Sequence, residues 1–132
     1  MKWVLAQSTL IWALVVSLLR PVGPHLAWVG FPLVALGGAA AIWAAITLGS
    51  AFTPLPTPRG PVVVNGPYRF VRHPIYTALV VLFVGLSLAY SWIGLAPTAA
   101  LAVLWFFKAR VEEGRLAERF PDYVEYRRRT RF

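Results

Sequence analysis

Long runs without a charged residue dominate this chain and limit what it can fold into. One such run, from Ile75 to Phe107, has 33 residues and contains no Asp, Glu, Lys or Arg. As one helix it would measure about 50 Å, against roughly 30 Å for the hydrocarbon core of a bilayer. It must therefore fold back, and Ser91 to Pro97, with Gly94 and Pro97 as helix breakers, is the predicted hairpin.

Two further uncharged runs precede this one. The first, from Trp3 to Leu19, is at the short end of the range for a membrane-spanning helix. A signal peptide is the competing interpretation, and it is disfavoured because the run is long for a signal segment and no Ala-x-Ala-like cleavage site follows. The second run, about residues 26–52, contains a patch of Gly and Ala from Gly37 to Ala45. Such patches favour close helix–helix contacts in lipid and permit a homo-oligomer.

The sequence thus predicts an all-α integral membrane protein with one domain, residues 1–132. About four transmembrane helices are expected, the last two forming a C-terminal hairpin, at about residues 3–19, 26–52, 75–91 and 94–109. A loop (53–74) and a helical C-terminal segment (110–132) are expected to be cytoplasmic. The composition agrees, because charged residues make up only 14% of the chain, against about 25% in soluble domains.

Cysteine is absent, which excludes disulfides, thiolate metal sites and cysteine nucleophiles, and no metal site is predicted. The net charge of +8 lies beside apolar runs. Anionic lipid headgroups are therefore the expected partner rather than nucleic acid.

The basic residues are distributed unevenly over the predicted topology. Four spans place the N-terminus, the loop 53–74 and the C-terminal segment on one side of the membrane. That side holds twelve of the thirteen Lys and Arg residues, and the other side holds Arg20. The positive-inside rule makes the first side cytoplasmic, so both termini are expected to face the cytoplasm of a bacterial-type inner membrane.

A polar cluster lies in the stretch from Asn65 to Tyr76. It contains two arginines, a histidine and two tyrosines, framed by Gly66-Pro67 and His73-Pro74. These residues can be interface anchors, since arginine and tyrosine are common at headgroup level. Ionisable groups beside membrane spans are also candidates for function, and the rigid proline framing favours that interpretation. The preceding proline-rich part, 53–67, is predicted to be extended and ordered, with a turn at Asn65-Gly66.

A second charged block begins at Lys108 and includes the pair Glu112-Glu113. Glu113 is interpreted as solvated, whereas Glu112 lies close to the membrane end of the predicted helix and is a candidate partner for a ligand cation. Together the two blocks offer cations for a carboxylate, an anion for an amine and aromatic faces for a cationic or planar group. S-adenosylmethionine carries all of these groups.

The two blocks contain a pair of motifs in a fixed order. The first is Gly66-Pro67-Tyr68-Arg69-x-x-Arg72-His73-Pro74-x-Tyr76, and after the predicted hairpin comes Glu112-Glu113-x-x-Leu116-x-x-x-Phe120-x-x-Tyr123-x-x-Tyr126. This arrangement resembles the isoprenylcysteine carboxyl methyltransferases and the wider group that includes phospholipid methyltransferases. The resemblance covers roughly the C-terminal two thirds of the chain.

The resemblance implies an S-adenosylmethionine-dependent methyltransferase embedded in the membrane. The cofactor-binding residues it implies are Val62, Val63, Tyr68, Arg72, His73, Pro74, Ile75, Tyr76 and Glu112. On the substrate side the family has an arginine four residues before the glutamate. This chain has Lys108 there, and Arg110 is the nearest arginine. The implied acceptor is lipophilic: a prenylcysteine-type carboxylate, a phospholipid or a small isoprenoid-like molecule.

One expectation concerns the mechanism. His73 is expected to position the cofactor rather than to move protons. The competing hypothesis is a non-enzymatic membrane protein that holds anionic lipid on a basic face. That protein would depend on the charges from Arg127 to Arg131 and not on Tyr68, His73 or Glu112.

Overall fold

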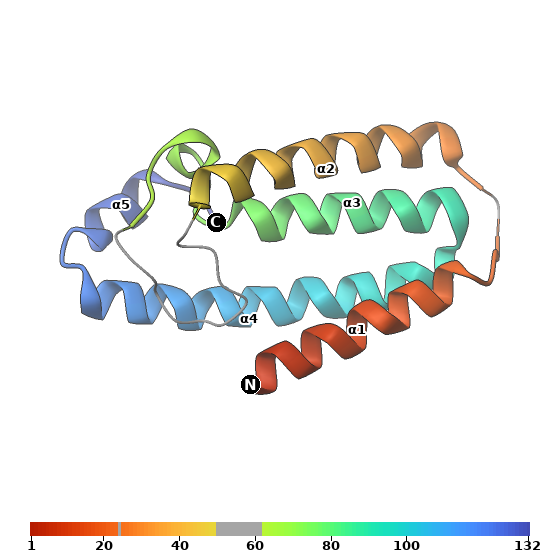
Figure 1. Cartoon of the computed structure of the whole chain (residues 1–132), viewed down its shortest axis with the longest axis horizontal. Helices are drawn as coiled ribbons and strands as arrows, with labels where there is room; N and C mark the ends of the chain where they lie inside the picture. The colour runs from red at the N-terminus through yellow and green to blue at the C-terminus, as the bar shows by residue number, and fades with distance from the viewer. Residues whose placement is uncertain (24, 50–61) are drawn as a thin grey trace.

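The structure is a computed structural model that describes residues 1–23, 25–49 and 62–132, and in these ranges the chain is helical. The described residues form five α-helices: α1 (Lys2–Leu18), α2 (Ala27–Leu48), α3 (Pro74–Tyr90), α4 (Leu95–Arg119) and α5 (Tyr123–Arg129). Two short 3₁₀ helices, η2 (Gly66–Arg69) and η3 (Trp92–Gly94), precede α3 and α4. The four long helices lie along one axis, and α5 lies at one end of them (Figure 1).

Helices α2 and α3 pack closely because glycine removes the side chains that would separate them. A methyl group added at Gly30 would lie 2.5 Å from the carbonyl oxygen of Gly85, and one added at Gly37 would lie 2.6 Å from the backbone nitrogen of Leu82. Part of the predicted Gly/Ala contact face is therefore used within the chain. The homo-oligomer stays a prediction.

The predicted hairpin is confirmed. Helix α3 ends at Tyr90, η3 spans Trp92–Gly94, and α4 begins at Leu95 and returns alongside α3 (Figure 1). Pro97 lies in the first turn of α4, where a proline costs no helical hydrogen bond. The predicted last span, about residues 94–109, and the predicted helical segment that follows it form one helix, because α4 runs without a break to Arg119.

The prediction of four membrane spans is supported only in part. Among the described residues, two helices, Ala27–Leu48 and Trp92–Arg119, are long and apolar enough to cross a membrane. The apolar helices Lys2–Leu18 and Pro74–Tyr90 have 17 residues each, or about 25 Å against a core of roughly 30 Å. In the most apolar 18-residue stretch of α2, only 17% is buried inside the structure. Most of the apolar surface of this helix is therefore free to contact the hydrocarbon of a bilayer.

The described residues cover only part of the predicted second span, 26–52, and of the predicted loop, 53–74. Helix α2 covers residues 27–48, whereas the prediction of an extended segment over 53–61 lies outside the described residues. Asn65 is extended and Gly66 has a φ of +53°, as the predicted turn at Asn65-Gly66 requires.

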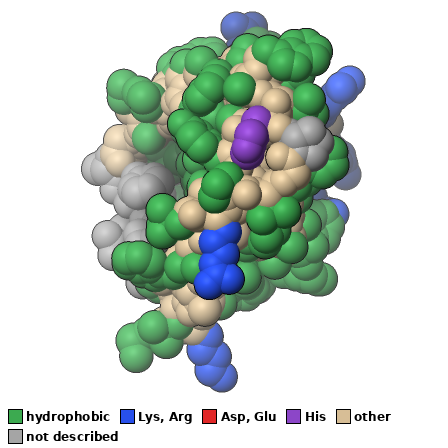
Figure 2. All heavy atoms as spheres, turned by 90° about the vertical axis from the view of Figure 1, so that its right-hand side faces the viewer, with side chains coloured by type: hydrophobic (Ala, Val, Ile, Leu, Met, Phe, Trp, Pro, Cys, Tyr) green, Lys and Arg blue, Asp and Glu red, His purple; other side chains and the backbone are tan. Residues whose placement is uncertain are grey.

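The two ends of the helical bundle differ in chemistry. The end of α2, the start of α3, the polar end of α4 and helix α5 meet at one end (Figure 1). The view onto the opposite end shows mostly hydrophobic side chains, a few basic side chains and no acidic side chain (Figure 2). The polar blocks on either side of the hairpin are thus brought together, as the sequence predicted.

The glycine packing gives a matched pair of variants. Gly37→Ala should lower the free energy of unfolding by about 1–3 kcal/mol, because its methyl group would overlap the α3 backbone. Gly38→Ala, on the next residue, meets only a Leu82 methyl group at 3.7 Å and should leave stability unchanged or slightly raised. Thermal unfolding of both variants in one detergent measures the difference, and equal midpoints would contradict the close α2–α3 contact.

Candidate functional site

A buried carboxylate joins the two polar blocks. Glu113 is 1% exposed, and its Oε1 accepts a hydrogen bond of 2.7 Å from Nε of Arg72. The same oxygen lies 3.2 Å from Nε2 of His73. The expectation that Glu113 is solvated is therefore wrong: the fold closes the 66–76 loop over this face of α4, and the arginine supplies the charge that makes burial of the carboxylate tolerable.

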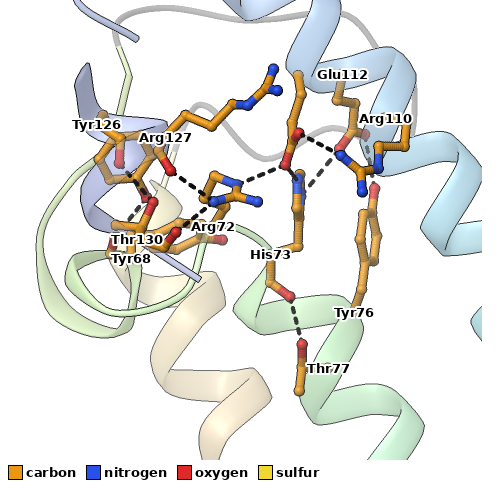
Figure 3. Close-up of polar contacts among 11 residues, drawn as sticks. Tyr68, Arg72, His73, Tyr76, Thr77, Arg110, Glu112, Tyr126, Arg127 and Thr130 are labelled. Atoms are coloured by element: carbon orange, nitrogen blue, oxygen red, sulfur yellow. Dashed lines mark hydrogen bonds and ion pairs between the residues drawn. The ribbon is translucent and has the colours of Figure 1, made fainter. Parts of the chain in front are cut away.

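Glu112, the other acidic residue, faces a different set of groups. Its Oε1 accepts a hydrogen bond of 2.8 Å from the Tyr76 hydroxyl, and its Oε2 lies 3.7 Å from Nδ1 of His73. The imidazole of His73 thus lies between the two carboxylates (Figure 3). Pro74 is the first residue of α3 and is buried, so the loop passes directly into the helix that carries Tyr76.

Aromatic rings line this polar cluster. The Tyr76 ring stacks on His73 at a centroid distance of 5.7 Å and on Trp105 of α4 at 5.6 Å. Trp105 is also tied to α1, because its Nε1 donates a hydrogen bond of 3.0 Å to Oε1 of Gln7. The site therefore has flat, electron-rich faces next to a carboxylate, which suits a cation or a planar ring.

The two candidates for the substrate side occupy different places. Lys108 is 2% exposed, and its Nζ lies 5.3 Å from the centroid of the Tyr76 ring. The side chain of Arg110 is 52% exposed, lies over Phe106, and reaches to 3.8 Å from Oε2 of Glu113. Lys108 is thus the cation enclosed with Tyr76, and Arg110 lies at the outer edge beside Glu113.

The last residues of the chain dock on the loop. We call residues 126–132 the docked segment. The hydroxyl of Tyr126 donates a 2.6 Å hydrogen bond to the carbonyl of Tyr68. The backbone N–H of Arg72 donates to the carbonyl of Arg131, and the N–H of Arg131 donates to the carbonyl of Phe70. The Phe132 ring then lies 5.2 Å from the His73 ring.

Two buried tyrosines mark where the docked segment meets the loop. Burial raises the pKa of the Tyr126 hydroxyl to about 12, against an opposing effect of the Arg72 charge. Burial, followed by the effects of Tyr126 and Glu112, also raises the pKa of Tyr68. Both hydroxyls are therefore neutral at physiological pH, and Tyr126 is available as a hydrogen-bond donor.

The structure brings together most of the residues that the sequence singled out. His73, Tyr76 and Glu112 share one cluster, which Tyr68, Arg72 and Arg110 border (Figure 3). Lys108 borders it too, next to the Tyr76 ring. Val62, Val63 and Ile75 are partly buried but have no polar contact with the cluster. Their assignment to a cofactor, like that of Arg72 and Pro74, stays a prediction.

Sequence reasoning missed Glu113, Trp105 and Phe132 as parts of the site. Tyr123 and Tyr126, which the spacing placed on one face, are both buried with ring centroids 5.7 Å apart. The i, i+3 spacing of these two tyrosines was the sequence signal that one face of the C-terminal segment packs on the rest of the protein. In the described part of the chain, no group of three or more His, Cys, Asp or Glu side chains is arranged to hold a metal ion.

Comparison with known families places the chain. The family described as phospholipid methyltransferase matches residues 26–122, which include α2, the loop, the hairpin and both glutamates. The chain belongs to this family. The match to the phospholipid methyltransferase group confirms the resemblance seen in the paired motifs.

Two curated relatives are similar to this family member. The cobalt-zinc-cadmium resistance protein CzcN of Cupriavidus metallidurans is 30% identical over 111 residues, which is 83% of this chain and 49% of the relative. The nickel-cobalt-cadmium resistance protein NccN of Alcaligenes xylosoxydans xylosoxydans is 39% identical over 71 residues, 52% of this chain and 33% of the relative. The chain thus spans at most about half the length of these relatives. No solved structure matches it significantly.

The cluster fits the methyl donor that the family implies. Glu112 supplies a partly exposed carboxylate for an amine, and the rings of Tyr76, His73 and Phe132 supply faces for a sulfonium or an adenine. Lys108 lies one turn before Glu112 on α4, next to the Tyr76 ring, and its charge interacts with that of Glu112.

The hydroxyl of Tyr126 should stabilise the docked segment measurably. Tyr126→Phe keeps the ring but leaves the Tyr68 carbonyl without this buried donor, and should cost about 1–3 kcal/mol of unfolding free energy. Tyr90→Phe is the control, because Tyr90 is 46% exposed and keeps its ring contact with Phe31 as phenylalanine. Denaturant unfolding of the two variants should differ, and equal losses would show that the bond contributes nothing.

Proposed function

We propose that this protein transfers a methyl group from S-adenosylmethionine to a lipophilic acceptor resident in the membrane. The observation that supports this most strongly is the position of Glu112. Its carboxylate accepts a hydrogen bond from the Tyr76 hydroxyl beside the stacked Tyr76 and His73 rings. All three residues lie within the stretch that matches the family. A carboxylate next to electron-rich rings suits a ligand with an amine and a sulfonium.

The residues have distinct roles in this proposal. Glu112 binds the amine of the cofactor, and Tyr76 orients Glu112 through its hydroxyl. His73 and Tyr68 contribute to the wall of the cofactor site, with Val62, Val63, Pro74 and Ile75 completing it as the isoprenylcysteine carboxyl methyltransferases suggest. His73 positions the cofactor, because Nε2 is already engaged by Glu113.

The chemistry needs alignment more than acid–base catalysis. The nucleophile displaces a thioether from the methyl carbon in line, and the cofactor, when bound, supplies the activated methyl group. Holding the reacting atoms near attack distance contributes up to roughly 7–11 kcal/mol. The rigid Pro-framed loop and the buried network on α4 provide that alignment.

Lys108 is the residue proposed for the substrate side. It is enclosed beside Tyr76, whereas Arg110 is half exposed. A lysine attracts a phosphate or carboxylate as a point charge and does not bind it in the two-pronged way of arginine. The proposed acceptors are therefore lipids or isoprenoid-like molecules with one anionic or polar group, which enter from the bilayer while the cofactor enters from the cytoplasm.

The location follows from the same arrangement. We propose an integral protein of a bacterial-type inner membrane, with both termini and the site on the cytoplasmic side. The loop before α3, the polar end of α4 and the segment after it, which form the polar end of the bundle, contain most of the basic residues, and these face anionic lipid headgroups.

Calorimetric binding of S-adenosylhomocysteine to the detergent-purified protein tests the cofactor. Glu112→Ala should weaken binding by about 10-fold or more, because a charged hydrogen bond contributes about 1.5–3 kcal/mol. Glu118→Ala is the matched control on the same helix, since Glu118 is exposed. Absence of binding to the folded wild type, or equal losses in the two variants, would contradict the proposal.

Transfer of a radiolabelled methyl group into bacterial lipid extracts tests the acceptor side. Lys108→Met should lower turnover about 10-fold or more while cofactor affinity stays within about threefold, as expected for an interaction with the acceptor alone. Arg110→Met should change turnover little. The reverse pattern would assign the substrate side to Arg110.

A non-enzymatic lipid-binding protein remains the alternative, and the basic helix α5 is the observation that favours it. Arg127, Arg128 and Arg129 form its last turn, and the side chain of Arg129 is 71% exposed. Replacing Arg128 and Arg129 with Gln should abolish binding to anionic vesicles in that case and leave S-adenosylhomocysteine binding absent throughout. The methyltransferase retains cofactor binding in the same variant.

A further inference from the structure

Two adjacent glutamates at the site have different surroundings. Glu112 is partly exposed toward the aromatic faces, whereas Glu113 is fully buried against the loop. We propose that Glu113 is a positioning residue: it fixes the His73 ring and, through Arg72, fastens the docked segment as one wall of the cofactor site. The inference deepens the proposed function and rests on it for the identity of the ligand.

The first step concerns His73. A carboxylate oxygen only accepts hydrogen bonds, so Nε2 of His73, 3.2 Å from Oε1 of Glu113, must carry the hydrogen. The other nitrogen, Nδ1, then faces Oε2 of Glu112 at 3.7 Å. Glu113 thereby sets the orientation of the ring that stacks on Tyr76.

The second step concerns Arg72. Its Nε donates a hydrogen bond to Glu113 at 2.7 Å, and its Nη1 donates to the carbonyls of Arg127 at 3.1 Å and Thr130 at 2.6 Å. One planar group therefore joins α4 to the C-terminal end of α5, where cations are favoured. Glu113 holds this guanidinium in the orientation that reaches both carbonyls.

The third step concerns the docked segment. A parallel β-bridge between Val71 and Arg131 lies directly beside Arg72. It carries Phe132 to a position between the rings of His73, at 5.2 Å, and Phe106, at 5.5 Å. If the guanidinium turned away, the carbonyls of Arg127 and Thr130 would lose a donor and the wall formed by Phe132 would loosen.

The charge of Glu113 is balanced by the protein. Oε1 faces Arg72 and His73, and Oε2, which makes no hydrogen bond among the described residues, lies 3.8 Å from Arg110. A ligand amine is therefore not needed to neutralise it. This distinguishes Glu113 from Glu112, whose carboxylate accepts a hydrogen bond from a tyrosine hydroxyl. The charges that influence Glu112 are those of Lys108, His73 and Arg115.

Hydrogen exchange and ligand binding, measured on the same proteins, test the division of roles. Exchange is followed by mass spectrometry on peptides that span residues 120–132, and binding of S-adenosylhomocysteine by calorimetry. Glu113→Ala should speed exchange in the docked segment by about 10-fold or more and weaken binding by a similar factor, because a preformed wall is lost. Glu112→Ala should weaken binding and leave exchange within about twofold.

Conservative variants keep the test informative if Glu113→Ala does not fold. Glu113→Gln keeps the shape and the Oε1 acceptor and should fall between the wild type and Glu113→Ala in both measurements. Arg72→Lys keeps the charge but lacks the planar set of donors, and should speed exchange like Glu113→Ala. Val124→Ala, an exposed position on α5, is the control for changes on that helix.

The outcomes separate the two proposals. Unchanged exchange in folded Glu113→Ala or Glu113→Gln protein would overturn the inference, as would faster exchange in Glu112→Ala. Weaker binding in the Glu113 variants with unchanged exchange would also overturn it, by placing Glu113 on the ligand. If the wild type binds no S-adenosylhomocysteine, the proposed function fails, and so does the claim that the docked segment forms a wall of the cofactor site. The exchange measurement still decides whether Glu113 holds the docked segment in place.

Discussion

The ion pair between Arg72 and Glu113 is the interaction on which the polar end of this protein depends. Both groups are nearly withdrawn from solvent, with side-chain exposures of 11% and 2%. Removing one partner of such a pair typically costs about 3–5 kcal/mol, because the other charge is left buried and uncompensated. The pair joins residues 41 positions apart, and the arginine extends the connection to α5 through two carbonyls.

The helices around this polar end are held together in a different way. Much of the chain is apolar, and large side chains such as Trp12, Trp28 and Ile46 remain exposed on α1 and α2. In lipid such side chains gain little by packing on one another, so close backbone approach replaces the hydrophobic effect as the source of specificity. The α2–α3 contact at Gly30 and Gly85 follows that rule. At the polar end, ion pairs and hydrogen bonds make the contacts between the loop, α4 and α5 specific.

The site illustrates how neighbouring residues on a helix acquire different roles. Glu112 and Glu113 point about 100° apart around α4. One direction leads to Tyr76 and the aromatic faces, and the other leads to Arg72 and the docked segment. In the proposed cofactor site, Glu112 faces the ligand and Glu113 faces the protein, so binding and positioning are assigned to separate groups.

The sequence by itself determined the class of the fold, the hairpin near Gly94 and the family. Each depends on a local pattern: run length, breaker residues, or motif spacing. Only the tertiary structure decided that Glu113 is buried and that residues 126–132 pack on the loop. The helical period shows that Glu112 and Glu113 face different ways, but not which one meets Arg72. That choice depends on partners about 40 residues or more away, which no local pattern encodes.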